Sequence, residues 1–211
     1  MFLDLAASRP DAPALRDDLG ATRTRLELVD RATRLGRLLR GPLGVGPGDH
    51  VALLTDNRVE LFETYLAAIL AGVWFVPVNG LFSSDEIDHV VRDSGARLVL
   101  AEPESAHLVA DDHPVVRLGM ELDGLLAGAD DEPFPADGPA GSRFSYTSGT
   151  TGSPKGVKRA IPATVGAMLE LQSRLGTQVG LDGSGPHLVT GPAYHAAPGG
   201  YAFFDLCNGA E

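Results

Sequence analysis

The stretch from Tyr146 to Lys158, which reads YTSGTTGSPKGVK, has the residue types of a phosphate-binding loop. Its three glycines can adopt positive φ, so successive backbone N–H groups can point to one place, and such a concave row of donors binds anions. The serine and threonine hydroxyls add donors that can also act as metal ligands. Lys155 adds a mobile positive charge suited to phosphate, and Pro154 stiffens the turn before it. Together these features predict a phosphate site.

This stretch is not the P-loop of nucleotide triphosphatases. That motif requires a glycine, four residues and then Gly-Lys-Ser or Gly-Lys-Thr, whereas the fifth residue after Gly149 is Pro154. The sequence also lacks G-x-G-x-x-G, the dinucleotide-binding pattern, and G-x-S-x-G, the nucleophile elbow. The common nucleotide-binding and hydrolase motifs are therefore not indicated.

The residues YTSGTTGSPKGV do resemble the phosphate-binding loop of the AMP-forming adenylating enzymes, which include acyl-CoA synthetases, peptide-synthetase adenylation domains and luciferases. In that family the loop holds the β- and γ-phosphates of ATP while a carboxylate attacks the α-phosphorus. The resemblance implies that ATP and Mg²⁺ bind here, with Lys155 in a catalytic role and Thr151 as a metal ligand. The residues implied to bind ATP are Thr147, Ser148, Gly149, Thr150, Thr151, Gly152 and Lys155. The alternative is a flexible Gly/Ser/Thr-rich linker, which would not need the fixed Pro-Lys-Gly ending.

A second segment, GPAYHAAPGG at 191–200, resembles the family motif at the acyl pocket, which usually has a Pro-Leu-Tyr-His core; here Ala193 replaces the leucine. By this resemblance His195 has a catalytic role beside the substrate carboxylate, or gates the pocket. Histidine can donate to a carboxylate in either charge state, and it need not act as a base because a carboxylate is already ionised at neutral pH. The alternative is a histidine in a turn between a strand and a helix.

The residues that follow His195 have two interpretations. Gly199 and Gly200 would allow a ligand or backbone to approach closely. The aromatic side chains of Tyr201, Phe203 and Phe204 would either line the acyl pocket or pack in the core.

Apolar periodicity predicts an α/β fold with a parallel sheet flanked by helices, because strands and helices alternate with short links. Capping boxes are expected at Asn57 with Glu60 and at Ser83 with Glu86. The expected elements are a helix over 24–40, strands over 50–55, 73–78 and 97–101, and helices over 57–71 and 83–93. The arginines of the first helix should form a solvated face that pairs with carboxylates, and they are Arg31, Arg34, Arg37 and Arg40.

Three segments are expected along the chain. Residues 1–141, which start with an irregular lead-in, form the N-terminal α/β subdomain, and residues 142–160 form a strand-loop-strand around the phosphate loop. Residues 161–211 begin a second, incomplete α/β subdomain. From residue 115 onward, the expected strands cover 115–118, 143–147, 156–160 and 187–191. A helical turn is expected over 120–126, and helices are expected over 162–175 and after 191.

Composition narrows the class of protein. The chain has 211 residues and a formal charge of −11, and a negative surface repels phosphate backbones, so nucleic acid is not expected as a partner. Its sole cysteine, Cys207, excludes a disulfide framework and is expected to be buried. The N-terminus lacks the features of a signal peptide, and the apolar run over 65–78 is shorter than the roughly 20 residues of a membrane span. A cytoplasmic protein without a membrane span is therefore expected.

The resemblance covers the whole chain, but members of the family run more than twice its length. No Tyr-Gly-x-Thr-Glu occurs here. The resemblance thus implies the N-terminal portion of a carboxylate–CoA ligase that forms an acyl-adenylate and then a thioester, with little activity alone. Its implied substrates are a carboxylic acid, ATP and coenzyme A, whose site is not in this chain. The alternatives are an enzyme that transfers the acyl group to a carrier protein or an amine, or a non-catalytic nucleotide-binding remnant. A strand over 187–191 would have an uncovered edge, so self-association, or disorder after about residue 180, is also expected.

Overall fold

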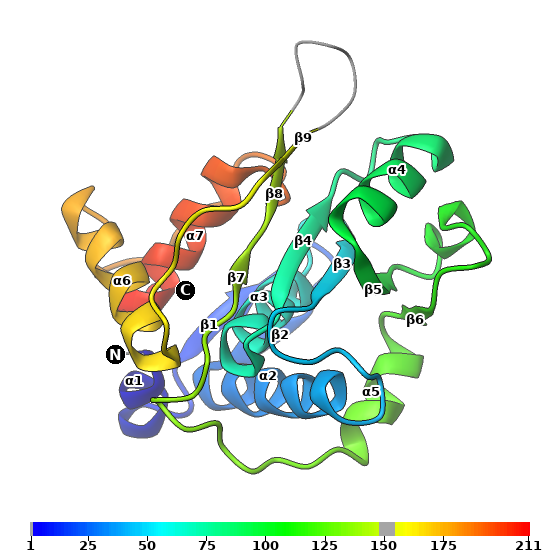
Figure 1. Cartoon of the computed structure of the whole chain (residues 1–211). Coiled ribbons are helices and arrows are strands. Elements are labelled where there is room, and N and C mark those ends of the chain that lie inside the picture. Colours follow the sequence, from blue (N-terminus) through cyan, green and yellow to red (C-terminus); the bar gives the residue numbers. More distant parts are fainter. Residues whose placement is uncertain (1, 148–154) are drawn as a thin grey trace.

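The computed structural model describes residues 2–147 and 155–211 (Figure 1). Its centre is a five-stranded sheet in which all neighbouring strands run parallel. In spatial order the strands are β6 (Val115–Arg117), β5 (Ala96–Ala101), β3 (His50–Leu54), β4 (Trp74–Val78) and β7 (Ser142–Arg143). The central strands are continuous apolar runs, as expected for a parallel sheet covered on both faces. The predicted fold class is confirmed.

Alternate residues of the central strand lie in two different hydrophobic clusters. Val51 and Leu53 pack in a large cluster with α2 (Arg25–Arg40) and α3 (Val59–Ala71). Ala52 and Leu54 pack in a smaller cluster with α4 (Ser84–Ser94) on the opposite face. This alternation follows from the two-residue period of a strand. The phosphate-loop strands lie against the α4 face, since Phe144 and Tyr146 pack on the smaller cluster.

Of the two predicted capping boxes, the one at Ser83 is confirmed and the one at Asn57 is wrong, and a further box is present at Thr24. The side chains of Thr24 and Ser83 each cap their helix in a reciprocal box with the glutamate three residues on. The box expected at Asn57 and Glu60 is wrong, because α3 begins at Val59 after Arg58, which makes no side-chain cap. Among the described residues, no helix has both the length and the apolar content that crossing a membrane would require.

Three of the four arginines of the predicted basic face of α2 pair with carboxylates, and the fourth, Arg40, lies 5.6 Å from the centroid of the Phe134 ring. Arg31 contacts the buried carboxylate of Glu63, and Arg34 forms an ion pair with Asp30 one turn earlier. Further ion pairs join Arg31 to Asp123, Arg34 to Asp131, and Arg37 to Asp130 and Glu132. The face therefore holds the 123–132 segment onto α2 and needs no anionic partner.

Short elements complete the N-terminal part. The predicted lead-in contains a helix, α1 (Phe2–Ser8), and an antiparallel pair, β1 (Pro13–Arg16) and β2 (Thr22–Thr24). After β5 come the 3₁₀ turn η1 (Ala106–Leu108) and then, beyond β6, the helix α5 (Met120–Ala127). The strand and helical turn predicted near 115 and 120 are thus confirmed.

The strand predicted over 143–147 is divided in two. β7 pairs with β4 in the parallel sheet, and after Phe144 the chain continues as β8 (Ser145–Thr147). β8 pairs antiparallel with β9 (Lys155–Val157), which gives the predicted hairpin with a shorter second strand. The hairpin thus rises directly from the edge strand of the main sheet (Figure 1).

The last fifty residues form two packed helices, α6 (Val165–Gln178) and α7 (Ala196–Asn208). The first begins after Thr164, whose hydroxyl accepts from Ala167 N, rather than at Pro162. Buried residues of both helices, including Met168 and Phe203, share the large cluster with α2 and α3, and Cys207 is buried as expected. The division into segments at 141 and 160 stays a prediction.

The buried strand predicted over 187–191 is wrong. The segment has no regular secondary structure, and Leu188 is 82% exposed. A strand requires a neighbour for its backbone, and the described residues pair no strand with this one. Instead His187 N donates to Glu211 O, and its Nδ1 lies 3.0 Å from the Asp205 carboxylate. The expectation of self-association, which rested on this edge, stays a prediction.

Candidate functional site

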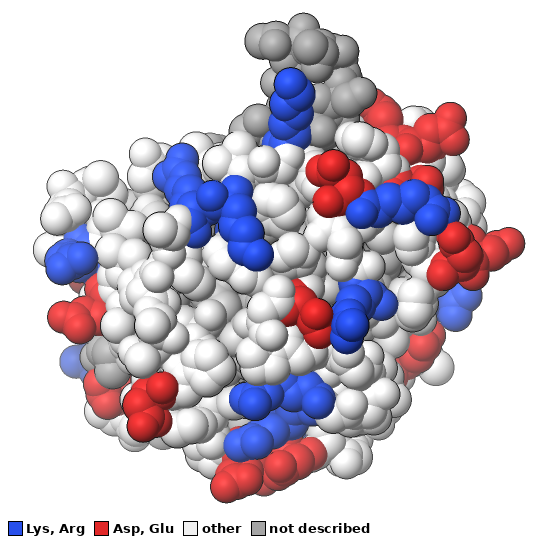
Figure 2. All heavy atoms as spheres, viewed as in Figure 1, with Lys and Arg blue, Asp and Glu red and all other residues white. Residues whose placement is uncertain are grey.

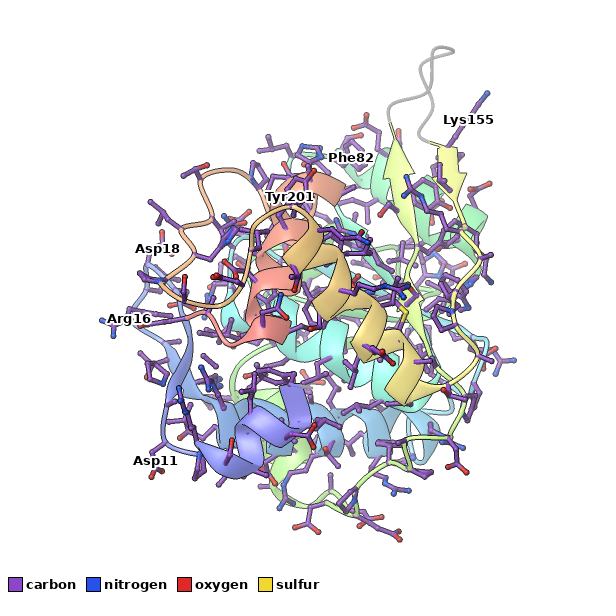
Figure 3. The ribbon with its side chains drawn as sticks, turned by 90° about the vertical axis from the view of Figure 1, so that its left-hand side faces the viewer. Asp11, Arg16, Asp18, Phe82, Lys155 and Tyr201 are labelled. Carbon is purple, nitrogen blue, oxygen red and sulfur yellow. The ribbon has the colours of Figure 1, made fainter. Side chains whose placement is uncertain are left out.

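The hairpin brings the two ends of the predicted phosphate loop together. Thr147 pairs with Lys155 at the tip of the β8–β9 ladder, and Ser145 pairs with Val157 at its base. Lys155 is exposed and points away from the body of the fold (Figure 3). The predicted ligands Ser148, Gly149, Thr150, Thr151 and Gly152 lie outside the described residues. Their roles, and those of Thr147 and Lys155, stay predictions.

Aromatic side chains cluster at the base of the hairpin, and they fit there because residue 156 is a glycine. A Cβ on Gly156 would come 2.5 Å from Phe144 Cζ and 3.2 Å from Tyr146 Cζ, so these two rings lie against the backbone of β9. The Phe144 ring also lies 5.4 Å from that of Tyr146 and 5.3 Å from the imidazole of His50. Gly156 therefore has a packing role, which differs from an anion-binding one.

One anchor joins the hairpin to α4. The hydroxyl of Tyr146 donates to Asp93 Oδ2 at 2.6 Å. Burial and the Asp93 carboxylate both raise the pKa of this hydroxyl, so it stays protonated as the donor. The first residue of the sequence motif is thus a structural attachment.

A second anchor joins the far side of the hairpin to the main sheet. Lys158 Nζ lies 4.3 Å from the centroid of the Trp74 ring and 3.3 Å from His50 Nε2, while His50 Nδ1 contacts Ser94 O. A cation over an indole face is attracted by the ring quadrupole. Because the other ring nitrogen faces a carbonyl oxygen, the imidazole carries its proton on Nδ1 and accepts from the ammonium at Nε2. The sequence alone did not link these three residues.

The predicted turn histidine lies at the start of α7. His195 is the N-cap residue and is exposed, and its backbone N–H donates to Pro192 O at 3.0 Å. The amide of Asn57 holds the preceding residues: its Oδ1 accepts from Ala193 N at 2.7 Å and its Nδ2 donates to Gly191 O at 3.0 Å. Asn57 therefore fixes the turn from the start of α3. No local sequence signal places a residue 136 positions away at this turn.

The aromatic residues after His195 divide between core and surface. Phe203 is buried and stacks on Tyr65 with 4.0 Å between ring centroids, so it is a core residue. Tyr201 is 47% exposed and, with Ala197, Pro198 and Leu188, lines a hollow of about 550 Å³ beside the first turns of α7. This hollow adjoins the His195 turn and has an apolar wall.

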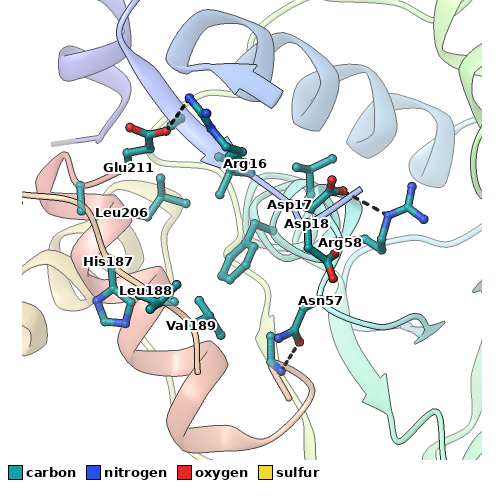
Figure 4. A pocket seen from close by; sticks show the side chains of 17 residues that line it. Arg16, Asp17, Asp18, Asn57, Arg58, His187, Leu188, Val189, Leu206 and Glu211 are labelled. Atoms are coloured by element: carbon teal, nitrogen blue, oxygen red, sulfur yellow. Dashed lines mark hydrogen bonds and ion pairs between the residues drawn. The ribbon is translucent and has the colours of Figure 1, made fainter. Parts of the chain in front are cut away.

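A smaller cavity of about 270 Å³ lies on the other side of the 187–190 segment (Figure 4). Phe62, Val189 and Leu206 contribute apolar walls. Two ion pairs lie among its lining residues: Arg58 with Asp17 at 3.2 Å, and Arg16 with Glu211 at 3.4 Å. The cavity reaches the back of the histidine turn, since Asn57 and Ala193 also line it.

Charge and metal-ligating groups are distributed unevenly. On the face in Figure 2, the lower edge of the molecule carries both acidic and basic side chains. Within the described part of the chain, one group of residues has metal-ligating atoms close together: Asp88, Asp112 and His113. The guanidinium of Arg92 hydrogen-bonds to both of these aspartates, so a cation already occupies their centre. This group is therefore an ion-pair cluster.

The parallel sheet with helices on both faces, the edge-strand hairpin and the following histidine turn define the N-terminal α/β portion of an adenylating enzyme. The chain belongs to the family of AMP-binding enzymes, whose family model matches residues 2–211. It is 38% identical over 196 residues to the feruloyl-CoA synthase of an Amycolatopsis species, a match that covers 91% of this chain and 38% of that protein. The chain thus spans less than half the length of this relative.

Two solved structures share the fold. The inhibitor-bound N-terminal domain of FACL13 from Mycobacterium tuberculosis is 25% identical, with a TM-score of 0.80, and the match covers 99% of this chain and 54% of that one. ATP-bound MatB from Rhodopseudomonas palustris is 26% identical, with a TM-score of 0.76, over 95% of this chain and 41% of that one. The family predicted from the loop motif is confirmed, and so is the fold predicted from apolar periodicity.

Proposed function

We propose that this chain supplies the phosphate-binding half of an ATP-dependent carboxylate–CoA ligase, which forms an acyl-adenylate and then a thioester. The observation that carries the proposal is the β8–β9 hairpin, which pairs Thr147 with Lys155 and leaves Lys155 exposed at the end of the ladder. Family membership and the ATP in the MatB structure support ATP as the ligand of this loop, and the resemblance of the loop motif implies Mg²⁺ with it. The name of the feruloyl-CoA synthase relative supports CoA as the acyl acceptor.

In this proposal the loop binds the leaving group. Attack of a carboxylate on the α-phosphorus of ATP gathers negative charge on the α-phosphate and on the departing pyrophosphate. Positioned donors and a cation stabilise that charge where it develops. Lys155 contributes an ammonium group, Thr147 to Gly152 contribute N–H and hydroxyl donors, and Thr151 is the expected Mg²⁺ ligand. Mg²⁺, when bound, neutralises part of the phosphate charge.

The carboxylic acid would lie at the histidine turn. His195 is exposed at the start of α7, and the hollow with Tyr201 on its wall begins one turn further along. A histidine there can donate to the substrate carboxylate while an apolar acyl or aryl group lies in the hollow. The acid would thus lie beside α7, with its carboxylate toward the hairpin side of the molecule.

Titration calorimetry with Mg·ATP tests the loop assignment on the chain itself. We expect binding by the wild type and about tenfold weaker binding by Lys155→Ala, as for the loss of one charge-assisted hydrogen bond. Arg97→Ala is the matched control, because Arg97 is an exposed cation that pairs with Asp49. Equal affinity of Lys155→Ala and the wild type would contradict the role given to the loop.

A pyrophosphate-exchange assay tests the half-site assignment. The sequence contains no Tyr-Gly-x-Thr-Glu, so the chain alone should bind Mg·ATP yet exchange little pyrophosphate. Robust exchange would show that these 211 residues hold a complete adenylation site, and the half-site proposal would then be wrong.

A further inference from the structure

A single arginine contacts both parts of the candidate site. Arg143 lies in β7, four residues before Thr147, and its Nε donates to Ser145 Oγ in β8 at 3.0 Å. Its Nη1 donates to Ala193 O at 3.4 Å, and its Nη2 donates to Tyr194 O. These two carbonyl groups directly precede His195. One planar guanidinium therefore connects the strand that leads into the phosphate loop with the turn that presents the histidine.

Several arginines of the surrounding helices differ from Arg143 in their partners. Arg31, Arg34, Arg58 and Arg92 each form an ion pair with at least one carboxylate. Arg143 forms none with any residue the structure describes, and its partners are neutral oxygens. Burial lowers the pKa of its guanidinium to about 10. Burying a charge without a counter-charge is costly, so this position is a poor choice if stability alone is served.

The first turn of α7 is built around this guanidinium. A Cβ on Gly199 would lie 2.9 Å from Arg143 Nη1 and would collide with the carbonyl of Ala193. Gly199 N donates to His195 O at 3.2 Å, so the same glycine also takes part in the helix start that includes the histidine. On the opposite side the turn is held by Asn57, through Gly191 and Ala193. The turn is thus clamped from β7 and from α3.

We propose that Arg143 is a positioning residue that sets His195 relative to the β8–β9 hairpin. This inference rests on the proposed function, since it assigns a purpose to the distance between a phosphate site and a carboxylate site. Movement of the hairpin would pass through β7 and the guanidinium to the carbonyl groups before His195. Five N–H donors in a rigid fork suit this task better than the single flexible ammonium of a lysine.

Amide hydrogen exchange measured by NMR on the whole chain tests the mechanical part. In Arg143→Met we expect the amides of Ala193, His195 and Gly199 to exchange at least about tenfold faster, because the turn loses two of its carbonyl contacts. The amide of Leu35, which is buried in α2, should be unchanged. Arg143→Lys should give an intermediate increase, and Arg97→Met, an equal loss of charge at an exposed site, should give none.

Two outcomes decide the matter if Arg143→Met folds poorly. Unchanged exchange at the turn in Arg143→Lys would overturn the inference. A rise shared equally by Leu35 would overturn it too, because that pattern indicates a global loss of stability.

The functional part is tested by adding Mg·ATP and following the His195 imidazole signals. In the wild type we expect the His195 signals to shift on nucleotide binding, and in Arg143→Lys the shift should fall to less than about half. An equal shift in both proteins would overturn the coupling through Arg143. Absence of Mg·ATP binding in the wild type would contradict the proposed function instead, and the exchange experiment would still decide what Arg143 does to the turn.

Discussion

The hairpin and the histidine turn are held in place by different means. The β8–β9 hairpin has its own backbone ladder and a base of aromatic rings, two of which come from its own sequence neighbourhood. The turn at 191–195 has no ladder, and its backbone is held by two distant side chains, Asn57 and Arg143. The hairpin is therefore a largely local structure, whereas the turn depends on the assembled fold.

This difference bears on function, because the two regions would hold the two reactants. The ladder of the hairpin joins residues that are close in the chain, and Tyr146 and Lys158 attach it to α4 and to the main sheet. A carboxylate site on a turn clamped from α3 and β7 forms only when the first half of the chain has packed. Substitutions should therefore affect the two regions independently, except through Arg143.

The substitution with the largest expected effect overpacks the hairpin at Gly156. Gly156→Val places a branched side chain where the Phe144 and Tyr146 rings lie. Overpacking of this kind costs about 2–3 kcal/mol of unfolding free energy, and the strands should separate before the sheet does. Urea unfolding measures the loss of unfolding free energy, and amide exchange of β8 measures the separation of the strands. Amide exchange at Ala193 should not change.

Gly185→Val is the control for that substitution. Gly185 has no atom within 4 Å of an added Cβ and does not have positive φ, so the same side chain should be tolerated there. A loss of stability at Gly185 as large as that at Gly156 would show that the aromatic cluster is not the cause.

The substitution with the next largest expected effect destabilises the turn at 191–195 and leaves the hairpin intact. Asn57→Ala removes a donor and an acceptor from the backbone of Gly191 and Ala193, at a cost of about 1–2 kcal/mol. Asn57→Asp keeps the acceptor for Ala193 N but turns a carboxylate oxygen toward Gly191 O, so it should cost about as much as Asn57→Ala. Urea unfolding with exchange at Ala193 and Gly156 checks this, and faster exchange at Gly156 would contradict the independence of the two regions.

The same contrast explains what could be predicted from the sequence. The parallel sheet, the helix over 24–40 and the hairpin depend on apolar periodicity, caps and turn residues that are neighbours in the chain, and these predictions were confirmed. Asn57 was assigned to a capping box because Glu60 stands three residues later. The structure uses its amide for a turn far along the chain, which no local pattern records.

The wrong strand at 187–191 has a similar cause. Its apolar residues match a buried strand, but a strand is defined by the neighbour that completes its hydrogen bonds, and the described residues provide none there. The Lys158 contacts were also missed, because His50 and Trp74 meet it only through the register of β3 with β4. Loop residues 148–152 were predicted from motif alone, and their roles stay predictions.

A smaller effect is expected when the contacts of Lys158 with Trp74 and His50 are removed. Lys158→Met removes the cation over Trp74 and the donor to His50, and it should cost about 1 kcal/mol or less. Lys158→Arg should retain most of the stability, because a guanidinium also stacks on an indole. Trp74 is the sole tryptophan, so a change in its emission reports on this contact directly. Unchanged emission in Lys158→Met would contradict the contact.

The smallest expected effect is a pH dependence of the unfolding free energy that comes from His50. Burial lowers the pKa of His50, against the raising effect of its hydrogen bond to Ser94, and the charge of Lys158 lowers it further. The unfolded chain then binds more protons than the folded one below the unfolded pKa of about 6.5. The contribution of His50 to the free energy of unfolding should therefore be constant above that pH. As the pH decreases below it, this contribution should fall until the pH passes the lowered pKa of His50 in the folded chain.

Urea unfolding between about pH 5 and pH 8 measures this dependence. His50→Gln should flatten the curve in that window, and His107→Gln, an exposed histidine in η1, should not. Because protonated His50 cannot accept from Lys158, acid should speed amide exchange in β9 relative to the chemical rate and leave Ala193 unaffected. An equal acid response at Ala193 would mean that the hairpin and the turn are coupled by more than Arg143.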